Sequence, residues 1–203
     1  MKNKSTMFQL TYGLFVLSAR DGGKDNGCIV NTVEQVTDSP NRIIAVVNQS
    51  NYTHDMILKT GQFNVSILSE KASFDLFRRF GFQSGRDVDK LEGWSGYKRA
   101  ENGIIYVTEG TNGYLCAKVT DTVDLGSHTM FIAQVEDGDV LDDTESVTYS
   151  YYHKHIKPQP AETKTTGWRC KICGYVYEGE ELPPDFICPL CKHGAADFEK
   201  IES

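Results

Sequence analysis

Two closely spaced pairs of cysteines near the C-terminus constrain this chain more than any other feature. Four of its six cysteines form two Cys-x-x-Cys pairs, Cys170 with Cys173 and Cys188 with Cys191. In a reducing compartment such pairs indicate a metal site, because disulfides do not persist there. The short gap lets both thiolates of a turn reach one ion, and two turns complete a tetrahedron. Spacing alone leaves iron and zinc open, since both accept four sulfur ligands.

Length and composition describe an ordinary globular chain with an acidic balance. It has 203 residues and a formal net charge of −7 at pH 7, with 39% hydrophobic and 24% charged residues. The acidity argues against nucleic acid as a partner, because a phosphate binder needs a basic face. Apolar runs such as residues 43–47 are too short to span a membrane, so no membrane association is expected. The N-terminus is polar rather than signal-like, which predicts a cytoplasmic location.

A segment rich in proline and threonine predicts a boundary between a large and a small domain. Residues 154–167 contain two prolines and one large apolar side chain, a composition typical of a linker. The domains would then span residues 1–153 and 168–203. The small domain has little core of its own, so metal binding would supply much of its folding free energy, on the order of 10 kcal/mol. The sequence leaves open whether the linker is flexible or packed.

The large domain is expected to be mainly β. Runs of β-branched and large apolar residues predict strands, with turns at residues 109–113 and 136–139. The predicted strands cover residues 13–19, 28–36, 42–48, 63–68, 104–108, 114–123 and 129–135. Short helices are predicted at residues 53–60 and 71–80, each stopped by a glycine. Many short strands at close spacing indicate a closed or nearly closed antiparallel barrel.

The large domain has no classical nucleotide-binding motif. Neither a G-x-G-x-x-G opening a helix nor a Walker loop occurs, so a nucleotide would bind without a Rossmann fold. Cys28 and Cys116 have apolar neighbours and are predicted to be small core residues. Residues 48–53 follow an apolar strand and precede a helix, which suits an anionic group. Plain N-capping by Asn51 or Thr53 explains the same residues and is favoured by local evidence alone.

The small domain resembles rubredoxin. Its first cysteine pair reads Trp-Arg-Cys-Lys-Ile-Cys-Gly-Tyr from residue 168, and its second reads Cys-Pro-Leu-Cys from residue 188. Rubredoxin knuckles have this pattern in an aromatic setting. The stretch between the pairs is short, as in the compact version at the end of rubrerythrins. The resemblance implies one iron per chain, bound by all four cysteines of the two pairs.

Several segments of the large domain together resemble the flavin reductase-like, FMN-binding split-barrel family. They lie at residues 26–32, 48–53, 57–66, 81–90 and 126–131. Joined to a rubredoxin-like tail, the chain resembles the high-molecular-weight rubredoxins of anaerobic bacteria. This resemblance implies a homodimer that takes electrons from NADH through FMN and iron. A flavodiiron protein, or a similar redox protein that reduces nitric oxide or oxygen, would then accept them.

The resemblance also implies an FMN site. Its residues would be Asn31, Thr32, Asn48, Gln49, Ser50, Asn51, Thr53, Arg86 and Lys90. The first two would line the isoalloxazine, the next three its polar edge and the ribityl chain, and Asn51 with Thr53 the phosphate. The two cations would add positive charge there, although a solvated charged loop explains them equally well. His128 matches a family histidine near the nicotinamide and is the candidate catalytic residue.

The two implied cofactors predict a converter of electron pairs into single electrons. NADH delivers two electrons as a hydride, FMN accepts the pair and releases it singly, and a four-thiolate iron takes one at a time. Two alternatives stay open: an electron carrier without NADH activity, and a flavin reductase with a structural zinc ribbon. Whether NADPH replaces NADH is also left open. The acidic residues within 178–185 would steer a basic partner, although a solvated loop is the simpler interpretation.

Overall fold

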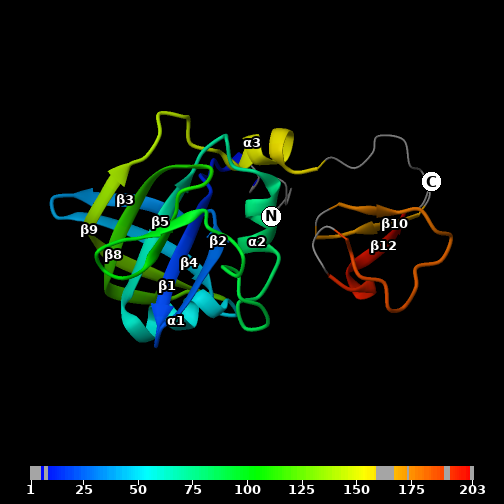
Figure 1. Ribbon diagram of the computed structural model, residues 1–203, viewed down its shortest axis with the longest axis horizontal. Coiled ribbons are helices and arrows are strands. Elements are labelled where there is room, and N and C mark those ends of the chain that lie inside the picture. Colours follow the sequence, from blue (N-terminus) through cyan, green and yellow to red (C-terminus); the bar gives the residue numbers. More distant parts are fainter. Residues whose placement is uncertain (1–5, 7–8, 159–166, 173, 190–192, 202–203) are drawn as a thin grey trace.

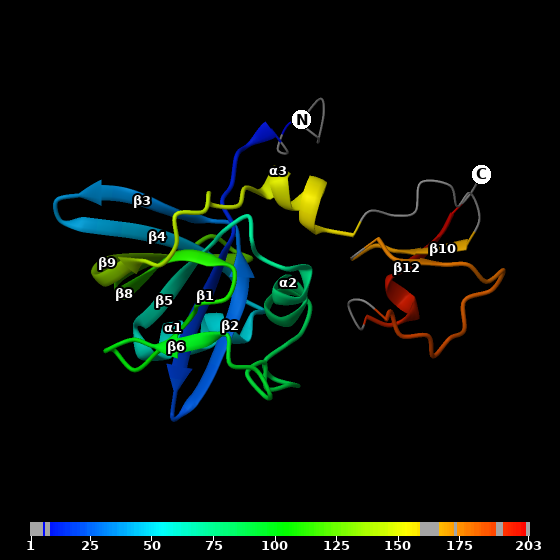
Figure 2. The same ribbon diagram turned by 45° about the horizontal axis from the view of Figure 1, so that its top comes forward.

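The chain folds into a large and a small unit. The computed structural model describes residues 6, 9–158, 167–172, 174–189 and 193–201. Two views show the large unit as a barrel of strands, with the small unit on the side of the barrel that carries helix α2 (Phe74–Gly81) (Figures 1 and 2). No helix in these ranges is long and apolar enough to cross a membrane.

A seven-stranded antiparallel sheet forms the barrel. Its strands are β1 (Phe15–Asp21), β2 (Lys24–Val30), β3 (Val33–Asp38), β4 (Asn41–Asn48), β5 (Gln62–Leu68), β8 (Thr111–Asp124) and β9 (His128–Val140). They are ordered β2-β1-β5-β8-β9-β4-β3 across the sheet. The edge strands β2 and β3 follow one another in the chain, yet no ladder joins them among the described residues. The barrel is therefore split between them, and the predicted mainly β, antiparallel barrel is confirmed.

Helices and one small hairpin complete the large unit. Helix α1 (Tyr52–Thr60) begins after Asn51, whose side chain accepts a hydrogen bond from the Thr53 amide at 3.1 Å. The helix ends at Gly61, which has a left-handed φ of 70° that glycine adopts without strain. The other elements are β6 (Tyr97–Arg99), β7 (Ile105–Val107), α3 (Tyr149–Tyr151) and the π-turn η2 (Tyr152–Ile156). The hydrogen bond from the Thr53 amide identifies Asn51 as the N-cap of α1.

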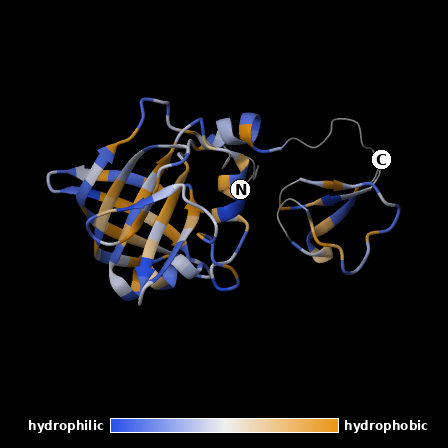
Figure 3. Ribbon diagram, in the orientation of Figure 1, coloured by the Kyte–Doolittle hydropathy of each residue, from blue (hydrophilic) through white to orange (hydrophobic). Residues whose placement is uncertain are grey.

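Two apolar clusters stabilise the large unit. They lie on opposite faces of the sheet, because β1 and β5 bury side chains on both faces. Leu17, Phe63 and Phe131 are fully buried inside the barrel. On the outer face of the sheet, Val16 packs in a second cluster with Phe77 of α2. Each such side chain contributes roughly 1.5–3 kcal/mol on burial. Figure 3 shows the hydrophobic residues gathered along the strands and the hydrophilic ones on the loops.

The turn predicted at residues 136–139 is wrong. Strand β9 continues through this Asp-Gly sequence and stays paired with β8 to Val140. A bulge in the ladder absorbs the irregularity. A Cβ at Gly138 would lie 2.6 Å from the Tyr114 carbonyl oxygen, so the glycine permits close strand pairing rather than a turn.

Other expectations need smaller corrections. The strand predicted at residues 28–36 is interrupted after Val30, and the chain continues in β3 on the opposite edge of the sheet. Tyr149 begins helix α3, where Thr148 caps the helix. Cys28 and Cys116 are 2% and 3% exposed, which confirms them as core residues.

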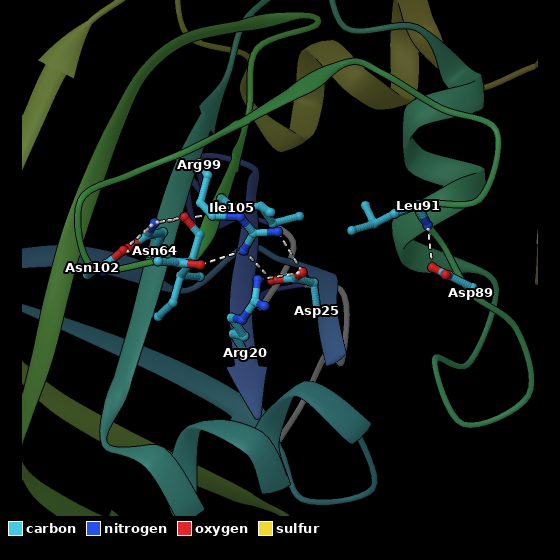
Figure 4. A network of polar contacts seen from close by, with 10 residues as sticks. Arg20, Asp25, Asn64, Asp89, Leu91, Arg99, Asn102 and Ile105 are labelled. Atoms are coloured by element: carbon cyan, nitrogen blue, oxygen red, sulfur yellow. Dashed lines mark hydrogen bonds and ion pairs between the residues drawn. The ribbon is translucent and has the colours of Figure 1, made fainter. Parts of the chain in front are cut away.

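A polar network attaches the hairpin of β6 and β7 to the edge strand β2 (Figure 4). The Asp25 carboxylate accepts hydrogen bonds from Arg20 at 3.2 Å and from both terminal nitrogens of Arg99 at 2.9 Å. The Asp25 hydrogen bonds raise the pKa of the Arg99 guanidinium. Beside them, Asn102 donates to the buried Asn64 at 2.7 Å. The network holds the strand whose far end forms one wall of the candidate site.

The small unit is a three-stranded antiparallel sheet around two cysteines. Its elements are β10 (Gly167–Cys170), β11 (Val176–Tyr177), β12 (Phe198–Ile201) and the 3-10 turn η3 (Ala195–Asp197). Cys170, Cys188 and Phe198 form its buried core, surrounded by partly buried aromatic side chains. On the barrel side of the predicted linker, residues 154–156 belong to η2, and Ile156 packs against the second cluster of the large unit. Residues 159–166 of that segment lie outside the described residues.

Candidate functional site

A cavity of about 380 Å³ opens where the two edges of the barrel meet. We call it the barrel cavity; its lining is Ile29, Val30, Asn31, Thr32, Val46, Asn48, Asn51, Leu125 and His128. These residues come from the end of β2, the link to β3, the end of β4, the residue before α1, the turn after β8 and the start of β9. An apolar floor with a few polar groups at its edge suits a flat ring system with polar substituents.

A second cavity of about 250 Å³ adjoins the first at the N-terminus of α1. The two share Ile29 and Asn51 and so lie next to each other; we call the pair the groove. The remaining residues of this helix cavity are Ser50, Tyr52, Phe80, Gly81, Phe82, Gln83, Ser84, Gly85, Lys90 and His193. Because backbone amides and the positive end of the helix dipole lie here, this end of the groove favours an anion.

A buried lysine supplies positive charge to the helix cavity. Lys90 is 4% exposed, and its ammonium donates to the Gly27 carbonyl at 2.9 Å and the Phe80 carbonyl at 3.1 Å. Burial lowers the pKa of Lys90 to about 8, while the neighbouring Cys28 acts in the opposite direction. A bound anion would favour the charged form of Lys90 and raise this pKa.

Two further cations lie against the ring of Tyr52, which lines the helix cavity. The Lys24 ammonium is 4.8 Å from the ring centroid and donates to the Gly85 carbonyl at 3.0 Å. The Arg86 guanidinium is 4.9 Å from the same centroid and donates to Asp55 at 2.5 Å. These contacts hold both cations beside the groove.

Six of the nine predicted FMN contacts line the groove: Asn31, Thr32, Asn48, Ser50, Asn51 and Lys90. The Asn31 side chain has no hydrogen-bond partner among the described residues, so its amide is available to a ligand. The Thr32 hydroxyl donates to the Val46 carbonyl at 2.8 Å. The Asn48 side-chain oxygen accepts from the amide and hydroxyl of Ser50 at 2.9 and 2.8 Å, which shapes the turn into α1.

The other three predicted contacts, Gln49, Thr53 and Arg86, do not line either cavity. Gln49 donates to Asp124 at 3.0 Å and so fixes the end of the β8–β9 hairpin. Thr53 is fully buried, and its hydroxyl accepts from Asn26 at 2.9 Å, because this face of α1 packs on β2. Arg86 remains beside the groove through its contact with Tyr52.

His128, the candidate catalytic residue, lines the barrel cavity. It is the first residue of β9, half-buried, and pairs with Asn48 of β4 across the ladder. Its Nδ1 is 2.8 Å from the Ser127 hydroxyl, and the residue lines the barrel cavity. A hydrogen-bonding imidazole is thus held at the mouth of the groove.

Sequence reasoning missed Lys24, Tyr52, Ser84 and Gly85. A Cβ at Gly85 would lie 2.1 Å from the Asn26 side-chain oxygen, so only glycine permits this close approach. Gly85 lies within residues 81–90, a segment that resembles the flavin reductase-like family, so the sequence did offer a signal for it. Lys24 gave none, because it belongs to the β1–β2 hairpin and reaches Gly85 only through the tertiary fold.

The structure places one cysteine of each pair in the core of the small unit. Cys170 and Cys188 are 1% and 0% exposed. Cys170 accepts a backbone hydrogen bond from Gly174 at 2.9 Å, and Gly174 has a positive φ of 82°, as a tight metal-binding turn requires. The Cys188 amide donates to the His193 carbonyl at 2.8 Å. Cys173 and Cys191 lie outside the described residues.

Two protein-family models match the chain. The model of the flavin reductase like domain matches residues 7–159, and that of the rubredoxin-like domain of rubrerythrin matches residues 168–199. The first match covers most of the chain, so the protein belongs to the flavin reductase-like family, with a rubredoxin-like domain at its C-terminal end. It is an oxidoreductase-type flavoprotein with a metal-binding, electron-transfer domain.

Curated relatives share this two-part organisation or one half of it. A high molecular weight rubredoxin of Moorella thermoacetica is 37% identical over 95% of this chain and 96% of its own length, so the chain is a homologue of that protein. A ferric-chelate reductase (NAD(P)H) of Archaeoglobus fulgidus is 33% identical over 81% of this chain and 96% of its own. A rubrerythrin of Nitratidesulfovibrio vulgaris is 50% identical over 38 residues, 19% of each protein.

Solved structures share the barrel fold. An NADH:FAD oxidoreductase of Streptomyces globisporus C-1027 superimposes with a TM-score of 0.66 at 19% identity, over 73% of this chain and 86% of its own. The flavin reductase PheA2 gives a TM-score of 0.59 at 19% identity, over 71% and 89%. At these identities the likeness concerns the fold.

Proposed function

We propose that this protein is an NAD(P)H-dependent flavo-rubredoxin. FMN would occupy the groove, one iron ion per chain would be held by four cysteines, and electrons would pass from a pyridine nucleotide through both to a redox partner. The observation that carries the proposal is the groove itself, because a mostly apolar cavity lies next to a cationic pocket in a chain that also carries two cysteine knuckles. We also propose domain boundaries at residues 1–153 and 168–203, with 154–167 as a linker whose residue Ile156 packs against the large unit.

The lining and the positive charge of the groove support FMN as its ligand. The barrel cavity would hold the isoalloxazine against Ile29, with Asn31 positioned to hydrogen-bond its polar edge. The helix cavity would hold the phosphate between Asn51 at the start of α1 and the ammonium of Lys90. When bound, FMN supplies the chemistry of accepting two electrons and releasing them one at a time.

His128 and its neighbours would position the electron donor. The imidazole stands at the edge of the barrel cavity, where it would bind the nicotinamide or its ribose. The apolar residues Ile29, Val30, Val46 and Leu125 around the cavity would limit the access of water to a bound ring. His128 is therefore the proposed catalytic residue.

The described cysteines fit a four-thiolate iron site. Cys170 and Cys188 are buried together in an aromatic core, and each lies at a turn closed by backbone hydrogen bonds. Iron in such a site takes up one electron at a time. Cys173 and Cys191 would complete the ligand set.

The proposed assembly is a homodimer that serves a flavodiiron protein or a similar acceptor. Exposed apolar side chains on the long β8–β9 hairpin support association of two copies: Leu125 is 53% and Val140 74% exposed. Between the knuckles, Glu178, Glu181 and Asp185 are exposed acidic residues that would attract a basic acceptor surface.

A visible spectrum of the purified protein before and after addition of NADH tests the function. Flavin and thiolate-to-iron bands should be present, and both should bleach when NADH is added anaerobically. A colourless tail with stoichiometric zinc would support a flavin reductase with a zinc ribbon. Flavin and iron bands that do not bleach with either NADH or NADPH would support a carrier that is reduced by another protein.

A further inference from the structure

The small unit takes part in the groove of the large one. His193, which follows the second cysteine pair, lines the helix cavity together with Ser50, Asn51 and Lys90. Phe82, which follows α2, packs against the aromatic cluster of the small unit. The contact therefore has an apolar part and a polar part, and the polar part lies at the anion-favouring end of the groove.

We propose that the docked small unit completes the phosphate end of the flavin site through His193, so that flavin binding and docking stabilise each other. This inference rests on the proposed function, because it takes the phosphate of FMN as the anion in the helix cavity. Thermodynamic linkage requires the coupling to be reciprocal: a unit that binds the flavin more tightly when docked is itself docked more tightly by the flavin.

The same contact connects the metal knuckle to the groove. The carbonyl of His193 accepts the hydrogen bond from the Cys188 amide at 2.8 Å. A residue that lines the helix cavity is therefore one hydrogen bond away from a proposed iron ligand. On this inference, bound flavin favours docking at the surface from which the metal knuckle reaches the groove.

Charge substitutions at residue 193 test the inference, because a negative side chain should weaken FMN binding and a positive one should strengthen it. In the full-length, iron-loaded protein freed of flavin, His193→Glu should weaken FMN binding about 3- to 10-fold. His193→Lys should tighten it by a similar factor. Both changes should shrink with added salt. Riboflavin, which lacks the phosphate, should bind the two variants alike. Quenching of flavin fluorescence measures each affinity.

Matched controls separate docking from general charge effects. His155 is exposed, lies in η2 and lines neither cavity, so His155→Glu and His155→Lys should leave the FMN affinity unchanged. Iron content shows that the small unit is intact. If a change at 193 lowers it, Gly194 offers a second position, since a Cβ there meets no atom within 4 Å. Gly194→Glu and Gly194→Lys should show the same signs.

The outcomes distinguish the inference from the function on which it rests. Opposite effects of Glu and Lys on FMN, absent for riboflavin and at residue 155, support the completed site. Equal FMN affinity of wild type and both 193 variants, with iron retained, overturns it and leaves the proposed function standing. A wild-type protein that binds no FMN overturns the proposed function and this inference with it.

Discussion

At the scale of single residues, the buried ammonium of Lys90 has the largest effect on the affinity of the groove for an anion. Its two hydrogen bonds go to backbone carbonyls of β2 and α2, so the charge is held at a fixed place. Burial alone disfavours that charge, and no carboxylate is among the groups that shift its pKa. A bound phosphate would compensate this cost, which makes the affinity for FMN sensitive to the protonation of Lys90.

FMN affinity should fall as the pH rises through about 8, the pKa of Lys90 in the flavin-free protein. The protonated form binds the phosphate more tightly, and binding raises the pKa, so a proton is taken up in this range. Fluorescence titrations across the range measure the change. Lys90→Met should bind FMN more weakly and without this pH dependence. An affinity that stays flat in the wild type would contradict the assignment.

Substitutions at Asn51 should separate its capping role from its role in the groove. Asn51→Asp keeps an acceptor for the Thr53 amide, so the stability should change by less than about 0.5 kcal/mol. The added negative charge should nevertheless lower FMN affinity about tenfold or more. Asn51→Ala should lose about 1 kcal/mol of stability as well. Thermal unfolding and FMN titration measure the two effects, and unchanged FMN binding by Asn51→Asp would remove Asn51 from the site.

At the scale of elements, the small unit depends on metal because it has so little else to bury. Its buried core consists of Cys170, Cys188 and Phe198, with half-buried aromatic residues around them. Such a core cannot offset the conformational entropy of its ordered residues without metal–thiolate bonds. The barrel, by contrast, has two apolar clusters and needs no metal to fold.

Cys188→Ser should abolish stable iron binding and leave the barrel folded. The expected spectrum lacks thiolate-to-iron bands, while the main thermal transition stays within a few degrees of wild type. Cys116→Ser is the matched control, since it changes a buried thiol of the barrel. It should keep the iron and lower the stability of the barrel by about 1–3 kcal/mol. Loss of barrel structure in Cys188→Ser would show that the two units fold as one.

At the scale of the whole molecule, the unit in which each proposed cofactor lies predicts the reaction that this unit supports. The barrel cavity and His128 belong to the large unit, and the cysteine knuckles to the small one. A chain ending after residue 158 keeps Tyr152 and Ile156, which pack against the barrel, and should retain reduction of bound FMN by NADH. It should lose most turnover of a flavodiiron acceptor. Equal turnover by both forms would make the barrel the direct donor.

Electron transfer from the full-length protein to the acceptor should slow as salt is added. Exposed Glu178, Glu181 and Asp185 give the small unit an acidic surface, and screening weakens its attraction for basic residues of the acceptor. Reduction of FMN by NADH in the same samples is the internal comparison and should change much less. A transfer rate to the acceptor that does not respond to ionic strength would exclude the acidic stretch as the docking surface.

The sequence by itself determined the features that depend on short spacing. Two Cys-x-x-Cys pairs specify a thiolate metal site, because each pair forms its turn without help from distant residues. Runs of β-branched and large apolar residues predicted most strands, and Asn51 before a helix predicted its cap. The turn predicted at residues 136–139 was wrong because it also depended on short spacing alone. Asp-Gly favours a turn locally, but pairing with β8 across the sheet outweighs that preference.

Only the tertiary structure decided the composition of the groove. It is formed where β2, β4, β9, the N-terminus of α1 and the loop before Lys90 meet, and the order of strands in the sheet, not their sequence, makes these segments neighbours. The same packing buries Thr53 away from the groove and buries Lys90 so that its pKa falls. It also brings His193, from the far end of the chain, to the helix cavity. Local preferences carry no information on such contacts, because they arise from burial of apolar faces over the whole molecule.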